Sequence, residues 1–131
     1  MAKVLLVDDD APALELRKLI LEREGHDVSI AADPTTARAL FLSAQPDCIV
    51  LDLRLPEPAD GLSLIRDFRS ASPGVRIIAL CGWPPDLENT AESQMVNLVL
   101  TKPIRTATLV SALLNVGRTS PSAPDLRSGT P

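Results

Sequence analysis

Short apolar runs alternate five times with longer segments of helical periodicity along this chain, and few folds accommodate that order. The runs span residues 3–7, 27–31, 48–51, 75–80 and 98–100. Four of them are continuous stretches rich in Val, Ile and Leu, which indicates strands buried on both faces. The second run, DVSIA, alternates and indicates an edge strand. The alternation therefore predicts a parallel α/β sheet with right-handed crossovers.

The segments after the first two runs carry the signals of helix ends. Asp10 is placed to cap a first helix, and Gly25 is placed to end it. Asp33 and Pro34 begin a second helix, which continues to about Ser43. The apolar face of the first helix is expected to include Ala13, Leu16, Leu19 and Ile20.

The remaining helix signals are of unequal strength. Apolar residues over 62–68 mark a third helix, and leucines over 106–116 give a clear fifth helix. Residues 86–94 give only a weaker, polar pattern for a fourth helix, in a region broken by prolines. The pattern as a whole predicts a five-stranded parallel sheet flanked by five helices.

The length of 131 residues and the mass of 14.0 kDa fit one compact domain. Hydrophobic residues make up 45% of the chain, which is enough for a core without a disulfide or a structural metal. The segment over 118–131 is rich in Ser and Pro and lacks apolar periodicity. We therefore expect a domain over residues 1–117, followed by a disordered tail or the start of a linker.

Charge and hydropathy exclude several classes of partner. The formal net charge of −4 argues against a nucleic-acid surface. No apolar run approaches the roughly 18–20 residues of a membrane span, and the short apolar stretch of MAKVLLVDDD is unlike a signal peptide. Cys48 and Cys81 lack metal-binding spacing and are expected to be reduced thiols. We expect a cytoplasmic protein that contacts neither membrane nor nucleic acid directly.

Ligands of a parallel α/β sheet bind beyond the carboxyl ends of its strands. Asp8 and Asp9 follow the first run, Asp52 follows the third, and Lys102 lies just after the fifth. Carboxylates that converge at one edge repel one another unless a cation offsets them, and their hard oxygen atoms favour Mg²⁺. Asp52 is then suited to be a nucleophile toward phosphorus, and Lys102 to supply a second positive charge.

Each of these residues alone has a simpler explanation. An aspartate after a strand is often only a helix cap, and a lysine at a strand end is usually only solvated. The joint placement of Asp8, Asp9, Asp52 and Lys102 at one edge is what favours a functional site. His26 is a lone histidine, far in sequence from this edge, and is not expected to be catalytic.

The stretches VLLVDDD, IVLDLRLP, DGL and LTKP resemble the signature motifs of the response-regulator receiver family of two-component signalling, over residues 2 to about 117. The resemblance implies a stand-alone receiver with a doubly wound, flavodoxin-like (βα)5 fold. It implies that Asp52 is the phosphoacceptor. It also implies that Asp8, Asp9, Asp52 and the backbone carbonyl of Arg54 hold Mg²⁺, with Mn²⁺ as an alternative.

The same resemblance implies that Lys102 contacts the phosphoryl group and that the Lys102–Pro103 peptide bond is cis. It implies a sensor histidine kinase or a phosphotransfer protein as the donor. The output partner is not identified, and the output is expected to pass through protein contacts of a monomer or weak dimer. Such a domain is not a turnover enzyme.

The chain departs from the family pattern at two positions. Cys81 stands where the family usually has Thr or Ser, whose hydroxyl bonds a phosphoryl oxygen, and a thiol is a weaker donor. Val99 stands at the position of an aromatic switch residue. Cys81 is read as a buried replacement for Thr rather than as a redox sensor, which would need a lowered pKa.

Two further residues are expected at the rim of the site. Trp83 follows the fourth run and either contacts a partner or covers the site. Arg54 either shields or contacts the phosphoryl group, or is simply an exposed loop arginine.

Two other functions are considered beside the signalling receiver. A degenerate interaction module, independent of phosphorylation, is favoured by Cys81 and Val99 and opposed by the intact acidic residues and Lys102. A metal-dependent phosphohydrolase often carries a second aspartate two residues after the nucleophile. Arg54 occupies that position, which disfavours the hydrolase.

Overall fold

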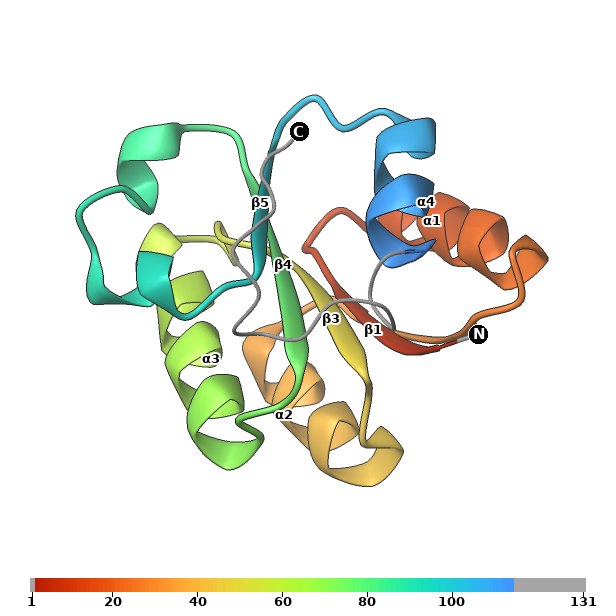
Figure 1. Ribbon diagram of the computed structural model, residues 1–131, viewed down its shortest axis with the longest axis horizontal. Coiled ribbons are helices and arrows are strands. Elements are labelled where there is room, and N and C mark those ends of the chain that lie inside the picture. Colours follow the sequence, from red (N-terminus) through yellow and green to blue (C-terminus); the bar gives the residue numbers. More distant parts are fainter. Residues whose placement is uncertain (1, 115–131) are drawn as a thin grey trace.

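The computed structural model describes residues 2–114, and the predicted tail over 118–131 lies outside these residues. Five parallel strands form one sheet in the order β2-β1-β3-β4-β5 (Figure 1). The strands are β1 (Lys3–Val7), β2 (Asp27–Ala31), β3 (Cys48–Asp52), β4 (Arg76–Cys81) and β5 (Leu98–Thr101). The predicted parallel sheet is confirmed, and the alternating strand β2 lies at an edge.

The strand order is that of a doubly wound, flavodoxin-like fold. The chain winds outward from β1 to β2 and then returns across β1 to β3, so the direction of winding changes between β1 and β3. In such sheets the ligand crevice opens beyond the carboxyl ends of the two strands at this switch point. The topology therefore places the ends of β1 and β3 at the centre of any binding site.

Two layers of helices cover the sheet (Figure 1). Helices α1 (Ala11–Arg23) and α4 (Thr106–Leu114) cover one face, while α2 (Pro34–Ala44) and α3 (Pro58–Ala71) cover the other. Successive residues of β1 alternate between the two layers, because side chains of a strand point to opposite faces. Leu5 and Val7 pack in the cluster with α3, and Val4 and Leu6 pack in the cluster with α1.

The first two helices begin as the sequence predicts. Asp10 caps α1, and its Oδ1 accepts a hydrogen bond from the backbone N–H of Ala13 at 3.2 Å. Asp33 caps α2 through the N–H of Thr36 at 2.7 Å. Each side-chain oxygen satisfies a backbone donor that has no partner inside the helix.

The predicted apolar face of α1 is wrong at Leu16 and Leu19, whereas Ala13 and Ile20 are partly buried. Its buried residues are Leu14 and Leu21, whereas Leu16 and Leu19 are 58% and 52% exposed. Residues at i, i+3 and i+7 share a helix face, so the inward stripe runs through position 17, which is Arg17. Because Arg17 interrupts the row of apolar residues on this face, the apolar periodicity of the sequence does not identify the buried stripe.

The predicted fourth helix over residues 86–94 is also wrong. Two short 3₁₀ helices stand there, η1 (Pro84–Asp86) and η2 (Ala91–Gln94). Asn89 between them has a φ of 64°, a left-handed conformation that ends the first turn, and Thr90 caps the second. The prediction that the fifth strand is buried on both faces is therefore wrong: β5 lies at an edge of the sheet without a longer helix beside it, and Leu98 and Val99 are 40% and 43% exposed.

Two arginines of α3 fasten the segment that replaces the fourth helix. Arg66 pairs with Glu92 of η2 at 2.7 Å. Arg69 donates hydrogen bonds to the backbone carbonyl of Met95, at 3.0 and 2.8 Å, and to Oδ1 of Asn97, at 2.9 Å. These side-chain bonds hold the segment against α3, together with the packing of Leu87, Met95 and Val96 on the core cluster.

Candidate functional site

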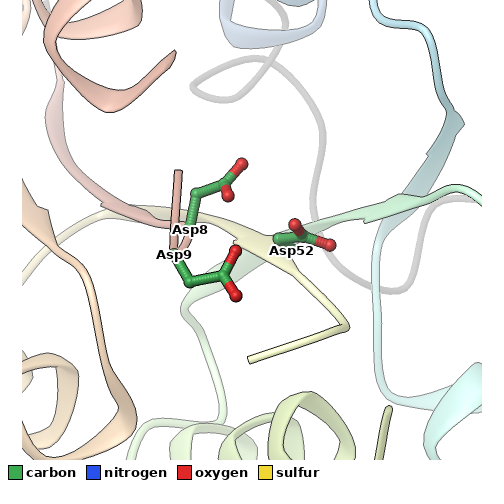
Figure 2. A group of neighbouring side chains, drawn as sticks. All are labelled: Asp8, Asp9 and Asp52. Carbon is green, nitrogen blue, oxygen red and sulfur yellow. The ribbon is translucent and has the colours of Figure 1, made fainter. Parts of the chain in front are cut away.

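Three aspartates meet at the carboxyl edge of the sheet (Figure 2). Asp8 and Asp9 directly follow β1, and Asp52 is the last residue of β3. The parallel register pairs Val7 with Leu51, so the next residue of each strand, Asp8 and Asp52, lies at the same level. Ligand oxygens of the three carboxylates lie within 4.8 Å of one another. Asp8 and Asp52 are buried, whereas Asp9 is exposed.

Lys102 joins the cluster from beyond β4. Its Nζ donates a hydrogen bond of 2.6 Å to Oδ2 of Asp52, although β4 separates β5 from β3. The backbone N–H of Lys102 donates to the carbonyl of Cys81 at 2.9 Å, and the Lys102–Pro103 peptide bond is cis. The second oxygen of Asp52, Oδ1, accepts from the backbone N–H of Arg54 at 3.2 Å.

The electrostatics of Asp52 combine opposing effects. Burial raises the pKa of its carboxyl group above the usual value, and the negative charge of Asp8 acts in the same direction. The hydrogen bond and positive charge of Lys102 oppose that rise. An additional cation at the cluster would favour the carboxylate form, which is the nucleophilic form.

Arg17 is a member of the site that the sequence interpretation missed. Its Nη1 lies 2.7 Å from Oδ2 of Asp8, whose other oxygen accepts from the backbone N–H of Asp10 at 3.0 Å. The signal in the sequence is its place between Leu14 and Leu21 on the inward stripe of α1. A long side chain there lies beside the end of β1 and brings its charge to the acidic edge.

At the rim, the side chain of Arg54 turns toward η1. Its Nε and Nη2 bond the two carboxylate oxygens of Asp86 at 2.9 and 3.2 Å, in a bidentate pair. Trp83 is 58% exposed. The Arg54–Asp86 pair therefore connects the loop after Asp52 with η1, the segment that follows β4.

Cys81 ends β4 and is 1% exposed. Its thiol donates to the backbone carbonyl of Trp83 at 3.0 Å. Burial raises the pKa of this thiol, and the carboxylates of Asp86 and Asp52 act in the same direction. The thiolate form that a redox sensor needs is therefore disfavoured.

The structure leaves two of the singled-out residues away from the acidic cluster. Val99 lies on the edge strand β5, where its side chain is 43% exposed. His26 directly precedes β2, at the amino end of that strand, opposite the carboxyl edge that holds the aspartates. Its Nδ1 accepts a hydrogen bond from the backbone N–H of Ala2 at 3.2 Å.

Gly61 of α3 allows the loop after Asp52 to pack tightly. Its N–H donates to the carbonyl of Leu53 at 3.0 Å. A Cβ at this position would collide with the backbone of Leu53. The glycine therefore permits the close approach that holds the chain immediately after Asp52.

The donor set of the acidic edge fits a hard divalent cation. Asp8, Asp9 and Asp52 offer carboxylate oxygens, the ligand type that Mg²⁺ prefers, and one face of the cluster is open through the exposed Asp9. Figure 2 shows the three side chains beside one another at the ends of their strands. These aspartates are able to bind a metal ion.

None of the helices within residues 2–114 is long and apolar enough to cross a membrane.

The chain is similar in sequence to a curated bacterial regulatory protein. The chain is 34% identical over 128 residues to the transcriptional regulatory protein TrcR of Mycobacterium tuberculosis. The alignment covers 90% of this chain and 46% of TrcR. The chain thus spans less than half the length of that protein, so the similarity concerns only part of TrcR.

Solved structures show the same fold. A response regulator receiver domain from Clostridium thermocellum superposes with a TM-score of 0.78 at 27% identity, covering 88% of this chain and 94% of that one. The chemotaxis response regulator CheY4 of Vibrio cholerae gives a TM-score of 0.78 at 28% identity, covering 88% and 98%. Residues 4–114 match the family model of the response regulator receiver domain. Since this match extends over most of the chain, the protein belongs to the response regulator receiver family.

Proposed function

We propose that the protein accepts a phosphoryl group on Asp52 from the phosphohistidine of a sensor kinase or a phosphotransfer protein, in a Mg²⁺-dependent reaction. The observation that carries the proposal is the pairing of a buried carboxylate, Asp52, with Nζ of Lys102 at 2.6 Å beside two further aspartates. As a receiver domain, the chain is a signalling module rather than a turnover enzyme.

The proposed transfer joins a carboxylate oxygen of Asp52 to phosphorus. The phosphorus–nitrogen bond of the donor breaks, and the imidazole of the donor leaves with the electron pair. Asp8, Asp9, Asp52 and the backbone carbonyl of Arg54 would hold the metal ion, which offsets negative charge on the transferring group. Lys102 then exchanges its bond to the Asp52 carboxylate for one to a phosphoryl oxygen.

In this proposal, phosphorylation alters which proteins bind the chain. The output passes through protein contacts near η1, η2 and β5, without direct contact to nucleic acid, and the chain acts as a monomer or weak dimer. Cys81 takes the place of the usual hydroxyl donor beside the phosphoryl group, so its link to that group is weaker.

A second candidate is a degenerate receiver that binds partners without phosphorylation. The observation in its favour is that the thiol of Cys81 already bonds the carbonyl of Trp83 at 3.0 Å, while Val99 supplies no aromatic ring for a switch. Cys81 and Val99 stand at the positions that would pass the phosphorylation signal to a partner, whereas the phosphoryl transfer itself takes place at Asp52.

One experiment separates these functions. The protein is incubated with Mg²⁺ and acetyl phosphate and weighed by mass spectrometry, in parallel with Asp52→Asn and with Asp67→Asn, which removes an exposed carboxylate of α3. We expect one phosphoryl group on the wild type and on Asp67→Asn, none on Asp52→Asn, and none after chelation of the metal.

The outcomes are distinct. A wild type that binds Mg²⁺ and gains no mass supports the degenerate receiver. Rapid multiple turnover of acetyl phosphate contradicts the proposed phosphoacceptor function of Asp52 and favours a hydrolase.

A further inference from the structure

Arg17 is a fixed positive charge inside the acidic edge. Its side chain is 20% exposed, that of Asp8 is 4% exposed, and Nη1 lies 2.7 Å from Oδ2 of Asp8. The other oxygen of Asp8 accepts the N–H of Asp10 at 3.0 Å. Both oxygens of this buried carboxylate are therefore engaged before any metal ion arrives.

Lys102 does not perform this task for Asp8. Its Nζ bonds Oδ2 of Asp52 at 2.6 Å, so the two cations of the site serve different carboxylates. Three carboxylates and two cations leave the metal-free cluster with a formal charge of −1, that is, −3 + 2. Leaving Asp8 buried without a partner would be costly, because an unpaired charge loses its hydration.

The same cation opposes metal binding. A divalent ion at the three aspartates would turn the formal charge of the cluster from −1 to +1, and it would share Asp8 with the guanidinium. Like charges a few ångströms apart in a partly buried site repel strongly. Arg17 therefore stabilises the metal-free cluster through its ion pair with Asp8 and makes the metal-bound cluster less favourable through repulsion.

We propose that Arg17 is a resident counter-charge for Asp8 that stabilises the metal-free protein and lowers the affinity of the site for Mg²⁺. The proposal rests on the magnesium site of the proposed function and adds a residue that sets its affinity. Arg17 acts through Asp8, so it is a positioning residue. Replacing Arg17 should therefore change both the melting temperature of the metal-free protein and the affinity for Mg²⁺.

The test replaces Arg17 and follows Mg²⁺ binding by NMR shifts of the backbone amides, with no phosphoryl donor present. Arg17→Met removes the charge and keeps an unbranched side chain, and Arg17→Gln keeps a hydrogen-bond donor for Asp8. Lys18→Met is the matched control, because it removes one positive charge from the next residue of α1, whose partner is the exposed Glu22.

We expect both Arg17 variants to bind Mg²⁺ roughly fivefold to tenfold more tightly than the wild type, and Lys18→Met to bind as the wild type does. Without metal, Arg17→Met should melt at a lower temperature than Lys18→Met, and saturating Mg²⁺ should narrow that difference. If Arg17→Met does not fold without metal, the Mg²⁺ affinity of Arg17→Gln is compared with that of the wild type instead.

Unchanged or weaker Mg²⁺ binding in both Arg17 variants overturns the proposal, and so does the absence of Mg²⁺ binding in all four proteins. The proposed function fails separately. If the wild type binds Mg²⁺ but gains no phosphoryl group, the function proposed for Asp52 is contradicted. The comparison of Mg²⁺ affinities still decides the role of Arg17.

Discussion

His26 is held in its neutral form far from the acidic edge. Its Nδ1 accepts the N–H of Ala2 at 3.2 Å, so the proton of the neutral ring is on Nε2, which is buried without a partner among the described residues. Burial lowers the pKa of this imidazole below the usual value. Near neutral pH the folded protein therefore binds fewer protons than the unfolded chain does.

The sign of this difference gives a prediction at the residue scale. Because the folded pKa is lowered, the stabilising contribution of His26 is present above its unfolded pKa of about 6.5 and is lost as the pH falls toward the folded value. We expect the free energy of unfolding, measured with urea, to decrease as the pH is lowered from neutral through the unfolded pKa of about 6.5. His26→Gln should flatten the curve in that window, and an unchanged slope would contradict the assignment.

At the scale of elements, the start of α3 is fixed by a glycine that touches a neighbouring backbone. Gly61→Ala should lower the free energy of unfolding by about 1–3 kcal/mol, because the added Cβ meets the main chain of Leu53. Gly74→Ala is the matched control, since a Cβ there has open space. Urea denaturation compares the two variants, and equal stabilities would refute the contact as the reason for the glycine.

The elements also show how far the sequence could predict the site. The strands and the caps of α1 and α2 follow local rules, and Asp8, Asp9, Asp52 and Lys102 could be found because they stand at strand ends. The fourth helix was predicted wrongly because a polar segment gives little periodicity, and the left-handed Asn89 that interrupts it has no strong local signal.

Two contacts between elements could not be predicted from the sequence pattern. Arg17 reaches Asp8 from the second turn of α1, and the pair of Arg54 with Asp86 joins residues that are 32 apart. Both depend on where long side chains point after the elements have packed. A charge on an otherwise apolar helix stripe is the one sequence signal that could have indicated Arg17.

For the molecule as a whole, metal binding should couple to global stability. Because Mg²⁺ would bind only the folded cluster, the melting temperature of the wild type should rise with Mg²⁺ concentration. Asp9 is exposed, so Asp9→Asn should melt close to the wild type without metal and lose most of that rise. Asp67→Asn should rise as the wild type does, and an undiminished rise in Asp9→Asn would exclude Asp9 as a ligand.

The single tryptophan of the chain gives this protein a built-in optical reporter. Trp83 is 58% exposed, and its backbone carbonyl accepts a hydrogen bond from the thiol of Cys81 at the end of β4. With no tyrosine in the chain, excitation of the indole has no phenolic background. We expect its emission to respond to events at the acidic edge, so that a stopped-flow fluorimeter can time them on unlabelled protein, without the perturbation that an attached dye would bring.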